Sequence, residues 1–253
     1  MTSLRRRLNL SGLLTVVVLL LLWQGIVVAG VIELQYLPAP TEIATAAVSL
    51  LRDGQLLDAT AHTLSAAVLG WVLALVVGGA LGVVLGTWRP ARALFAPTVD
   101  VLRTLPVVAL VPIAVLLLGF STTMEITVAA WAAAWPIVVN TMGGVAAVHP
   151  RLREVAATLH FTPARRIWSI MLPAAAPLVL VGARLGLSIS LIVTVIAEMI
   201  GNPKGLGYEL VQMQQALRPD AMFAAMLVIG ALGVLLNTAL LLLSARVGVR
   251  GRS

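Results

Sequence analysis

The residues of this chain that could do chemistry are few, and they lie inside long apolar runs. Asp100 and Arg103 are three residues apart, so their side chains can meet on one face of a helix. A charged side chain in lipid is costly unless it is paired or faces a water-filled cavity. We therefore expect Asp100 and Arg103 to form a structural ion pair.

Two further charged residues, Arg184 and Glu198, lie in a later apolar run. Arg184 comes eleven residues after Pro173, about 16 Å along a helix, which places it near mid-membrane. Its guanidinium could attract an anion such as a sulfonate or nitrate, or it could pair with a carboxylate such as Asp100. Glu198 could gate a pathway or reach the lipid headgroups. The candidate residues for a substrate pathway are Arg103, Asn140, Arg184 and Glu198.

Motifs for nucleotide, metal or catalytic chemistry are missing from the sequence. It has neither a Gly-x4-Gly-Lys-Ser/Thr loop nor a His-Glu-x-x-His pair, and it has no cysteine. Its three histidines, His62, His149 and His160, are far apart along the chain. The glycines of the loop 201–207 are not followed by the Lys-Ser/Thr pair of a phosphate cradle. We expect no catalytic residue, metal or cofactor in this chain, so a partner or an ion gradient must supply energy for any transport.

Composition defines the elements that position these residues. The 253 residues are 60% hydrophobic and 11% charged, with a mean hydropathy of +1.04, so most of the surface must meet lipid. Each apolar run is close to or longer than the roughly 20 residues that span a bilayer. The runs cover residues 10–32, 61–86, 93–119, 126–148, 173–200 and 221–245. We expect an all-α membrane protein with one transmembrane domain, 1–253, and about six transmembrane helices, the segment 61–148 holding spans 2 to 4.

The first run follows Arg5, Arg6 and Arg7, as in a secretory signal, but it is longer than a signal core of about 7–15 residues. We expect an uncleaved first helix. A net charge of +7 could suggest nucleic acid, but the arginines stand at the ends of apolar runs, which favours contact with membrane lipid instead.

Positive charges also predict the orientation in an inner membrane. Three basic residues, Arg52, Lys204 and Arg218, fall on one side, and twelve fall on the other. The twelve are Arg5, Arg6, Arg7, Arg89, Arg92, Arg151, Arg153, Arg165, Arg166, Arg246, Arg250 and Arg252. Because loops rich in Lys and Arg stay in the cytoplasm, both termini are predicted to be cytoplasmic.

Two segments are too polar or too short to span. Outside, residues 41–53 are predicted to form an interfacial helix with Thr41 as its N-cap. Inside, the stretch 149–172 contains two helix starts, Pro150 and the pair Thr162-Pro163, where a capping residue precedes a proline. We therefore predict two short helices on the cytoplasmic face.

The same cytoplasmic stretch carries a resemblance to a known family. Glu154-Val-Ala156-Ala-Thr-Leu-His160, followed after nine residues by Ile170-Met-Leu-Pro173, resembles the EAA loop of ABC importer permeases. Further matches, in order, are Leu37-Pro-Ala-Pro40, Leu102-Arg-Thr-Leu-Pro-Val-Val-Ala-Leu-Val-Pro112, Trp135-Pro-Ile-Val-Val-Asn140, Ala183-Arg-Leu-Gly186, Ala197-Glu198-Met and Gly205-Leu-Gly-Tyr208. The whole is similar, over about residues 34–246, to permeases for nitrate, sulfonates, taurine and pyrimidine-type thiamine precursors.

This resemblance implies a type I ABC importer permease fold with a cytoplasmic coupling loop between spans 4 and 5. It implies a second permease copy, a cytoplasmic ATPase dimer that binds ATP and Mg, and an extracytoplasmic solute-binding protein. The implied ATPase-coupling residues are Glu154, Val155, Ala156, Ala157, His160, Thr162 and Pro163. His160 replaces the glycine of the motif, where positive φ is expected, and histidine tolerates left-handed geometry better than β-branched residues do.

The implied function is uptake of a small anion of the sulfonate, taurine or nitrate type. A heterocyclic vitamin precursor is the alternative within the same class, and an ion-coupled secondary transporter or a scaffold without a pore is the alternative of another class. Among the remaining patterns, Gly78, Gly82 and Gly86 predict close helix–helix packing, by default between helices of this chain and alternatively at a dimer interface. Pro106, Pro112 and Pro136 are expected to bend helices, and Trp23, Trp88, Trp131 and Trp135 are assigned no substrate role.

Overall fold

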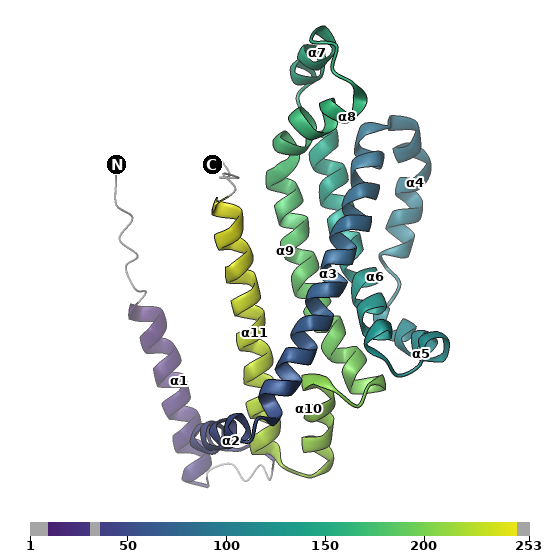
Figure 1. Ribbon diagram of the computed structural model, residues 1–253. Coiled ribbons are helices and arrows are strands. Elements are labelled where there is room, and N and C mark those ends of the chain that lie inside the picture. The colour runs from purple at the N-terminus through teal and green to yellow at the C-terminus, as the bar shows by residue number, and fades with distance from the viewer. Residues whose placement is uncertain (1–9, 31–35, 247–253) are drawn as a thin grey trace.

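A computed structural model describes residues 10–30 and 36–246, and every regular element in these ranges is a helix (Figure 1). The order is α1 Leu10–Val28, α2 Pro40–Arg52, α3 Gln55–Thr87, α4 Arg89–Leu102, α5 Val107–Leu118, α6 Thr122–Ala146, α7 Pro150–Thr158, α8 Pro163–Arg166, the π-helical turn η1 Ile167–Met171, α9 Leu172–Gly201, α10 Gly205–Gln215 and α11 Pro219–Arg246. The all-α expectation is confirmed.

The long helices α3, α6 and α9 form the centre of the bundle and run side by side in Figure 1. Small residues make this packing close. A Cβ built on Gly78 would lie 2.9 Å from the carbonyl oxygen of Ala134, and one on Gly86 would lie 2.6 Å from Cβ of Val145. The predicted role of the glycines in packing between helices of this chain is confirmed, since both contacts join α3 to α6.

Two ends of the bundle can be distinguished in Figure 1. At one end, called here the α7 end, lie α7, α8 and the connection between α3 and α4. At the other, called the α10 end, lie α2, α10 and the connection between α5 and α6. Helix α11 runs from the α10 end toward the α7 end.

Five helices in the described ranges are long and apolar enough to cross a membrane, and the number rises to six if α4 and α5 count as one broken span. The predicted bounds differ at several ends. Helix α3 begins at Gln55 and not at residue 61, α6 begins at Thr122 and not at 126, and α11 covers Pro219–Arg246. Helix α1 ends at Val28, whereas residues 31 and 32 of the predicted first span lie outside the described residues.

The expected span 93–119 is not one helix. Helices α4 and α5 meet at an angle of 88° across the segment 103–106. Pro106 caps α5 with extended backbone (φ −67°, ψ 106°). Proline disfavours the helical region for the residue before it, which here is Leu105, so the helix stops and restarts in a new direction. The bend expected at Pro106 is therefore a complete break between two helices and not a kink within one helix.

The segments that do not span the membrane differ from prediction in two details. Helix α2 is capped by Ala39, with Pro40 at its first position and the Glu42 carboxylate accepting from the Ala39 N–H at 2.8 Å, so Thr41 as N-cap is wrong. Residues 201–207 were expected to be a loop, but α9 continues to Gly201 and α10 begins at Gly205. Gly205 has φ +90°, which lets the chain turn into a helix that the sequence did not indicate.

Candidate functional site

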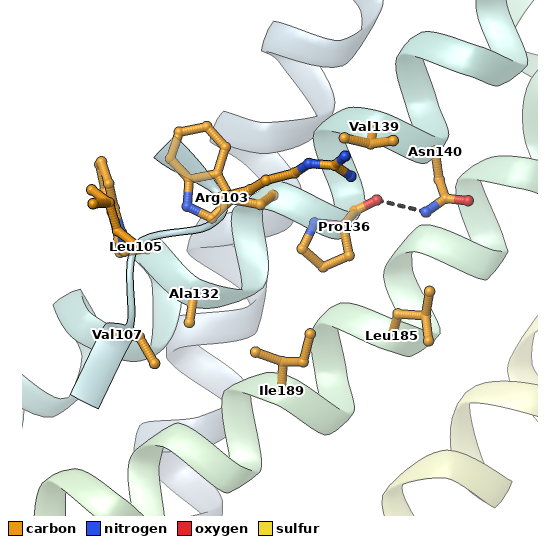
Figure 2. Close-up of a pocket in the computed structure, with 11 residues that line it drawn as sticks. Arg103, Leu105, Val107, Ala132, Pro136, Val139, Asn140, Leu185 and Ile189 are labelled. Atoms are coloured by element: carbon orange, nitrogen blue, oxygen red, sulfur yellow. Dashed lines mark hydrogen bonds between the residues drawn. The ribbon is translucent and has the colours of Figure 1, made fainter. Parts of the chain in front are cut away.

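A cavity of about 400 Å³ opens where α4 breaks into α5 (Figure 2). Its walls come from the break itself, from one face of α6 and from the middle of α9. The lining residues are Arg103, Leu105, Val107, Trp131, Ala132, Trp135, Pro136, Val139, Asn140, Leu185 and Ile189. Two of the four predicted pathway residues, Arg103 and Asn140, therefore meet in one cavity.

Arg103 stands at the end of α4, and its side chain extends toward Pro136 and Val139 in Figure 2. One guanidinium nitrogen lies 3.1 Å from Oδ1 of Asp100, so the predicted ion pair is confirmed. Both side chains are well exposed, 48% for Arg103 and 62% for Asp100, so the pair is not a buried one in this chain. A guanidinium has five N–H donors, and the contact with Asp100 occupies only part of them. Arg103 can therefore present positive charge to the cavity while it is paired.

The α6 wall of the cavity combines a proline, an amide and two indoles. Asn140 donates from Nδ2 to the carbonyl oxygen of Pro136 at 2.8 Å, one turn earlier on the same helix. Trp131 and Trp135 form an edge-to-face pair with ring centroids 4.9 Å apart. The sequence analysis assigned these tryptophans no substrate role. Their spacing of four residues, which places both on one helix face beside Pro136, was the signal that could have included them.

Arg184 lines a different cavity of about 840 Å³, between α9 and α11. Its Nε donates to Oδ1 of Asn237 at 2.6 Å. Asp100 as the partner of Arg184 is therefore wrong, because Asp100 pairs with its own helix neighbour. The sequence did not indicate Asn237, since a partner on another helix 53 residues later depends on how α9 and α11 pack. The structure does not bring Arg184 and Arg103 into one site.

Glu198 lines neither of these cavities and is 1% exposed near the α10 end of α9. Its Oε2 accepts from the Thr63 hydroxyl at 3.0 Å and from the Gly207 N–H at 2.9 Å. The expectation that Glu198 reaches the lipid headgroups is wrong, because the carboxylate is enclosed by α3 and by the start of α10. Glycine at 207 permits this, since a Cβ there would lie 2.9 Å from Cβ of Glu198.

The predicted coupling segment forms the two short helices α7 and α8, which project at the α7 end (Figure 1). Thr162 caps α8 as expected, its hydroxyl accepting from the Arg165 N–H at 3.3 Å, and Pro163 follows at the first helical position. Glu154 and Val155 are exposed on α7, which also contains Ala157, whereas Ala156 is buried at 1% exposure. A carboxylate and an apolar side chain are thus presented outward.

His160 occupies the turn between α7 and α8 with φ +49°, the left-handed geometry expected from the family's glycine. The turn closes through the Phe161 N–H, which donates to the carbonyl oxygen of Ala156 at 3.0 Å. The Arg165 guanidinium lies 4.4 Å from the centre of the Phe161 ring, a cation–π contact that joins the turn to α8.

The coupling segment is continuous with α9 through η1, a π-helical turn that the sequence did not indicate. Such turns occur often at functional positions because they insert one residue without ending the helix. Helix α8 is therefore joined without a break to the helix that carries Arg184 and part of the lining of the Arg103 cavity.

Comparison with known proteins finds relatives among transport permeases. The chain is 31% identical over 237 residues to the putative aliphatic sulfonates transport permease protein SsuC of Bacillus subtilis, covering 94% of this chain and 86% of that protein. It is 30% identical to the nitrate import permease protein NrtB of Synechocystis (88% and 83% covered) and 27% identical to the taurine transport system permease protein TauC of Escherichia coli (92% and 86% covered).

The fold is also found among solved structures. A chain of the MetNI methionine ABC transporter, solved in inward facing conformations, aligns with a TM-score of 0.61 and 18% identity over 74% of this chain and 96% of that one. The fold is thus that of type I ABC importer permeases, as expected. Residues 74–250 match the family model described as binding-protein-dependent transport system inner membrane component, and the chain belongs to this family.

Proposed function

We propose that this chain forms the translocation pathway of an ATP-driven importer for a small anion of the sulfonate, taurine or nitrate type. The observation that carries the proposal is the Arg103 guanidinium, held at the α4–α5 break on the wall of a cavity of about 400 Å³. The names of the relatives SsuC, TauC and NrtB support the same class of substrate. A cation beside a membrane pathway attracts anions and repels cations.

A heterocyclic vitamin precursor is the second candidate. The edge-to-face pair of Trp131 and Trp135 favours it, because aromatic walls can stack on a flat ring. The two candidates make different demands on Arg103. Transport of an uncharged or cationic heterocycle does not require its guanidinium, whereas transport of an anion does.

The energy comes from partners in this proposal. Two copies of the permease, a homodimer, surround the pathway, and a cytoplasmic ATPase dimer binds ATP and Mg and receives α7 and α8. A solute-binding protein delivers the anion at the α10 end. This chain is itself not catalytic. Glu154 lies in the middle of α7 and not in its first turn as expected, but its exposed carboxylate is suited to pair with a basic group of the ATPase.

The orientation follows from the basic residues. In the described part of the chain, Arg89, Arg92, Arg151, Arg165 and Arg166 belong to α4, α7 and α8 at the α7 end (Figure 1), which supports a cytoplasmic location for the coupling segment. The sequence-based count of twelve basic residues against three supports the same side for both termini. Import is the direction expected of a binding-protein-dependent system.

The test is uptake by the complete complex, with its ATPase and binding protein, reconstituted in lipid vesicles. Arg103→Gln is expected to lower uptake of taurine, a C4 alkanesulfonate or nitrate, whichever the wild type transports, by 10-fold or more. Arg89→Gln, at the other end of the same helix, is the control and should retain uptake. Full uptake by Arg103→Gln in an intact complex would refute the anion pathway. Replacing 154–170 with an unrelated linker should abolish ATPase binding, and normal ATP hydrolysis in that variant would refute the coupling role.

A further inference from the structure

Three side chains that are distant in sequence meet at the α10 end of the bundle. His62 comes from α3, Glu125 from the first turn of α6 and Glu198 from the last turns of α9. One potential ligand atom from each lies within 4.8 Å of those of the other two. The side chains of Glu125 and His62 are 0% and 17% exposed, and Glu198 is 1% exposed.

With both carboxylates ionised, this cluster would hold two negative charges beside a single imidazole. Across residues 10–30 and 36–246, His62 is the only basic side chain at ion-pair distance from either carboxylate, with Nε2 3.0 Å from Oε2 of Glu125. Two carboxylates ionised and buried side by side repel each other, and a buried charge without a counter-charge is strongly destabilising. A cation between them removes both penalties.

The hydrogen bonds hold the carboxylates in place but leave one acceptor free. Asn202 donates to Oε1 of Glu125, while Thr63 and the Gly207 N–H donate to Oε2 of Glu198. Oε1 of Glu198 is buried and, among the described residues, has no hydrogen-bond partner. Buried polar atoms normally have a partner, so this oxygen is an open position for a ligand at the cluster.

We propose that His62, Glu125 and Glu198 bind a divalent transition-metal ion of the zinc type. One imidazole and two carboxylates form a three-ligand set that Zn²⁺ accepts, with a fourth position for water. The imidazole favours Zn²⁺ over Mg²⁺ and Ca²⁺, which prefer oxygen ligands only. Thr63 and Asn202 supply the outer hydrogen bonds that orient ligating carboxylates in metal sites.

Bound metal would tie together the α10 ends of α3, α6 and α9. The start of α10 covers the site, because Gly205 lies directly against the Glu198 carboxylate, where a Cβ would overlap it. The Leu206 N–H donates to the Thr63 hydroxyl at 2.9 Å, so the same network holds α10 against α3. The cluster is separate from the Arg103 and Arg184 cavities, and this inference does not depend on the transported substrate.

The test uses the full chain, purified in detergent in its complex after removal of metal with a chelator. Zn²⁺ is added, with Mg²⁺ as the comparison, and binding is measured by metal analysis after desalting and by the shift in unfolding temperature. The wild type is expected to retain one Zn²⁺ per permease chain and to unfold at a higher temperature with Zn²⁺, but not with Mg²⁺. Failure of the wild type to retain Zn²⁺ would overturn the proposal and would mean that protons neutralise the carboxylates.

Variants locate the site. His62→Gln and Glu198→Gln should each weaken Zn²⁺ binding by 10-fold or more and remove the shift in unfolding temperature. Glu209→Gln is the matched control, because Glu209 is another carboxylate at the α10 end, bonded to Gln55 at 2.6 Å and outside the cluster. Two results would overturn the assignment. One is that Glu209→Gln weakens Zn²⁺ binding as much as Glu198→Gln does. The other is that both cluster variants bind Zn²⁺ as tightly as the wild type. Uptake by the wild type is measured in parallel, so a failure here is distinct from a failure of the proposed function.

Discussion

Because α3 packs closely against α6, alanine substitutions of a glycine in this interface and of a glycine outside it should have opposite effects on stability. A Cβ on Gly82 would lie 2.6 Å from Cβ of Thr141 and 2.9 Å from the carbonyl oxygen of Val138, which is backbone and cannot rotate away. A Cβ on Gly79, three residues earlier, would meet nothing within 4 Å. Gly79→Ala is therefore the matched control for Gly82→Ala.

The magnitudes follow from two terms. Alanine in place of glycine stabilises a helix by about 0.5–1 kcal/mol, and both variants gain this. Only Gly82→Ala overfills the interface, which costs about 1–3 kcal/mol. Gly79→Ala should thus stabilise the protein, and Gly82→Ala should be about 1–3 kcal/mol less stable than Gly79→Ala.

Unfolding temperatures of the two variants in the same detergent test this difference. In a chain of this size each kcal/mol corresponds to roughly 2–4 °C. The comparison between variants is informative because the helix-propensity term is common to both. Equal unfolding temperatures, or a more stable Gly82→Ala, would contradict the packing of α3 on α6 through this face.

Three further substitutions test other parts of the structure. Thr63→Val removes the hydroxyl that joins α3 to Glu198 and Leu206, and it should destabilise the protein by about 1–3 kcal/mol in thermal unfolding. Thr60→Val is the control, because the Thr60 hydroxyl bonds only within its own helix, and its stability should change much less. Thr162→Ala removes the cap of α8, costs about 1 kcal/mol locally, and should weaken ATPase binding in a pull-down; unchanged affinity would contradict a role for α8 in docking. Asn237→Leu removes the acceptor for the Arg184 guanidinium and should lower the unfolding temperature, and an unchanged temperature would show that the contact adds no stability.

Much of the fold was predictable because a helix that crosses lipid must be a long run of apolar residues. The length of the apolar runs located the spans, and the two helix starts at Pro150 and at Thr162-Pro163 located α7 and α8, since capping is a local property of the chain. The pair Asp100 and Arg103 was also predictable, because partners three residues apart need only a helix to meet.

The features that the sequence did not predict depend on tertiary packing. The break between α4 and α5 was hidden inside one apolar run, because hydropathy does not report direction. Asn237 became the partner of Arg184 through the packing of α9 on α11. The approach of His62, Glu125 and Glu198 required three helix ends to converge, and their separations along the chain carry no metal-binding signature.

Helix α9 is the element on which these sites converge. Its 30 residues span about 45 Å at 1.5 Å per residue, long enough to reach from one end of the bundle to the other. The coupling helices join its first turn through η1, Leu185 and Ile189 form part of the Arg103 cavity, and Glu198 lies near its last turn. Because α8, η1 and α9 are continuous, a movement imposed at α8 would act on the same helix that lines the cavity. With Glu198 anchored at the α10 end, displacement of α9 would increase toward α8, and the Arg103 cavity lies between these two points.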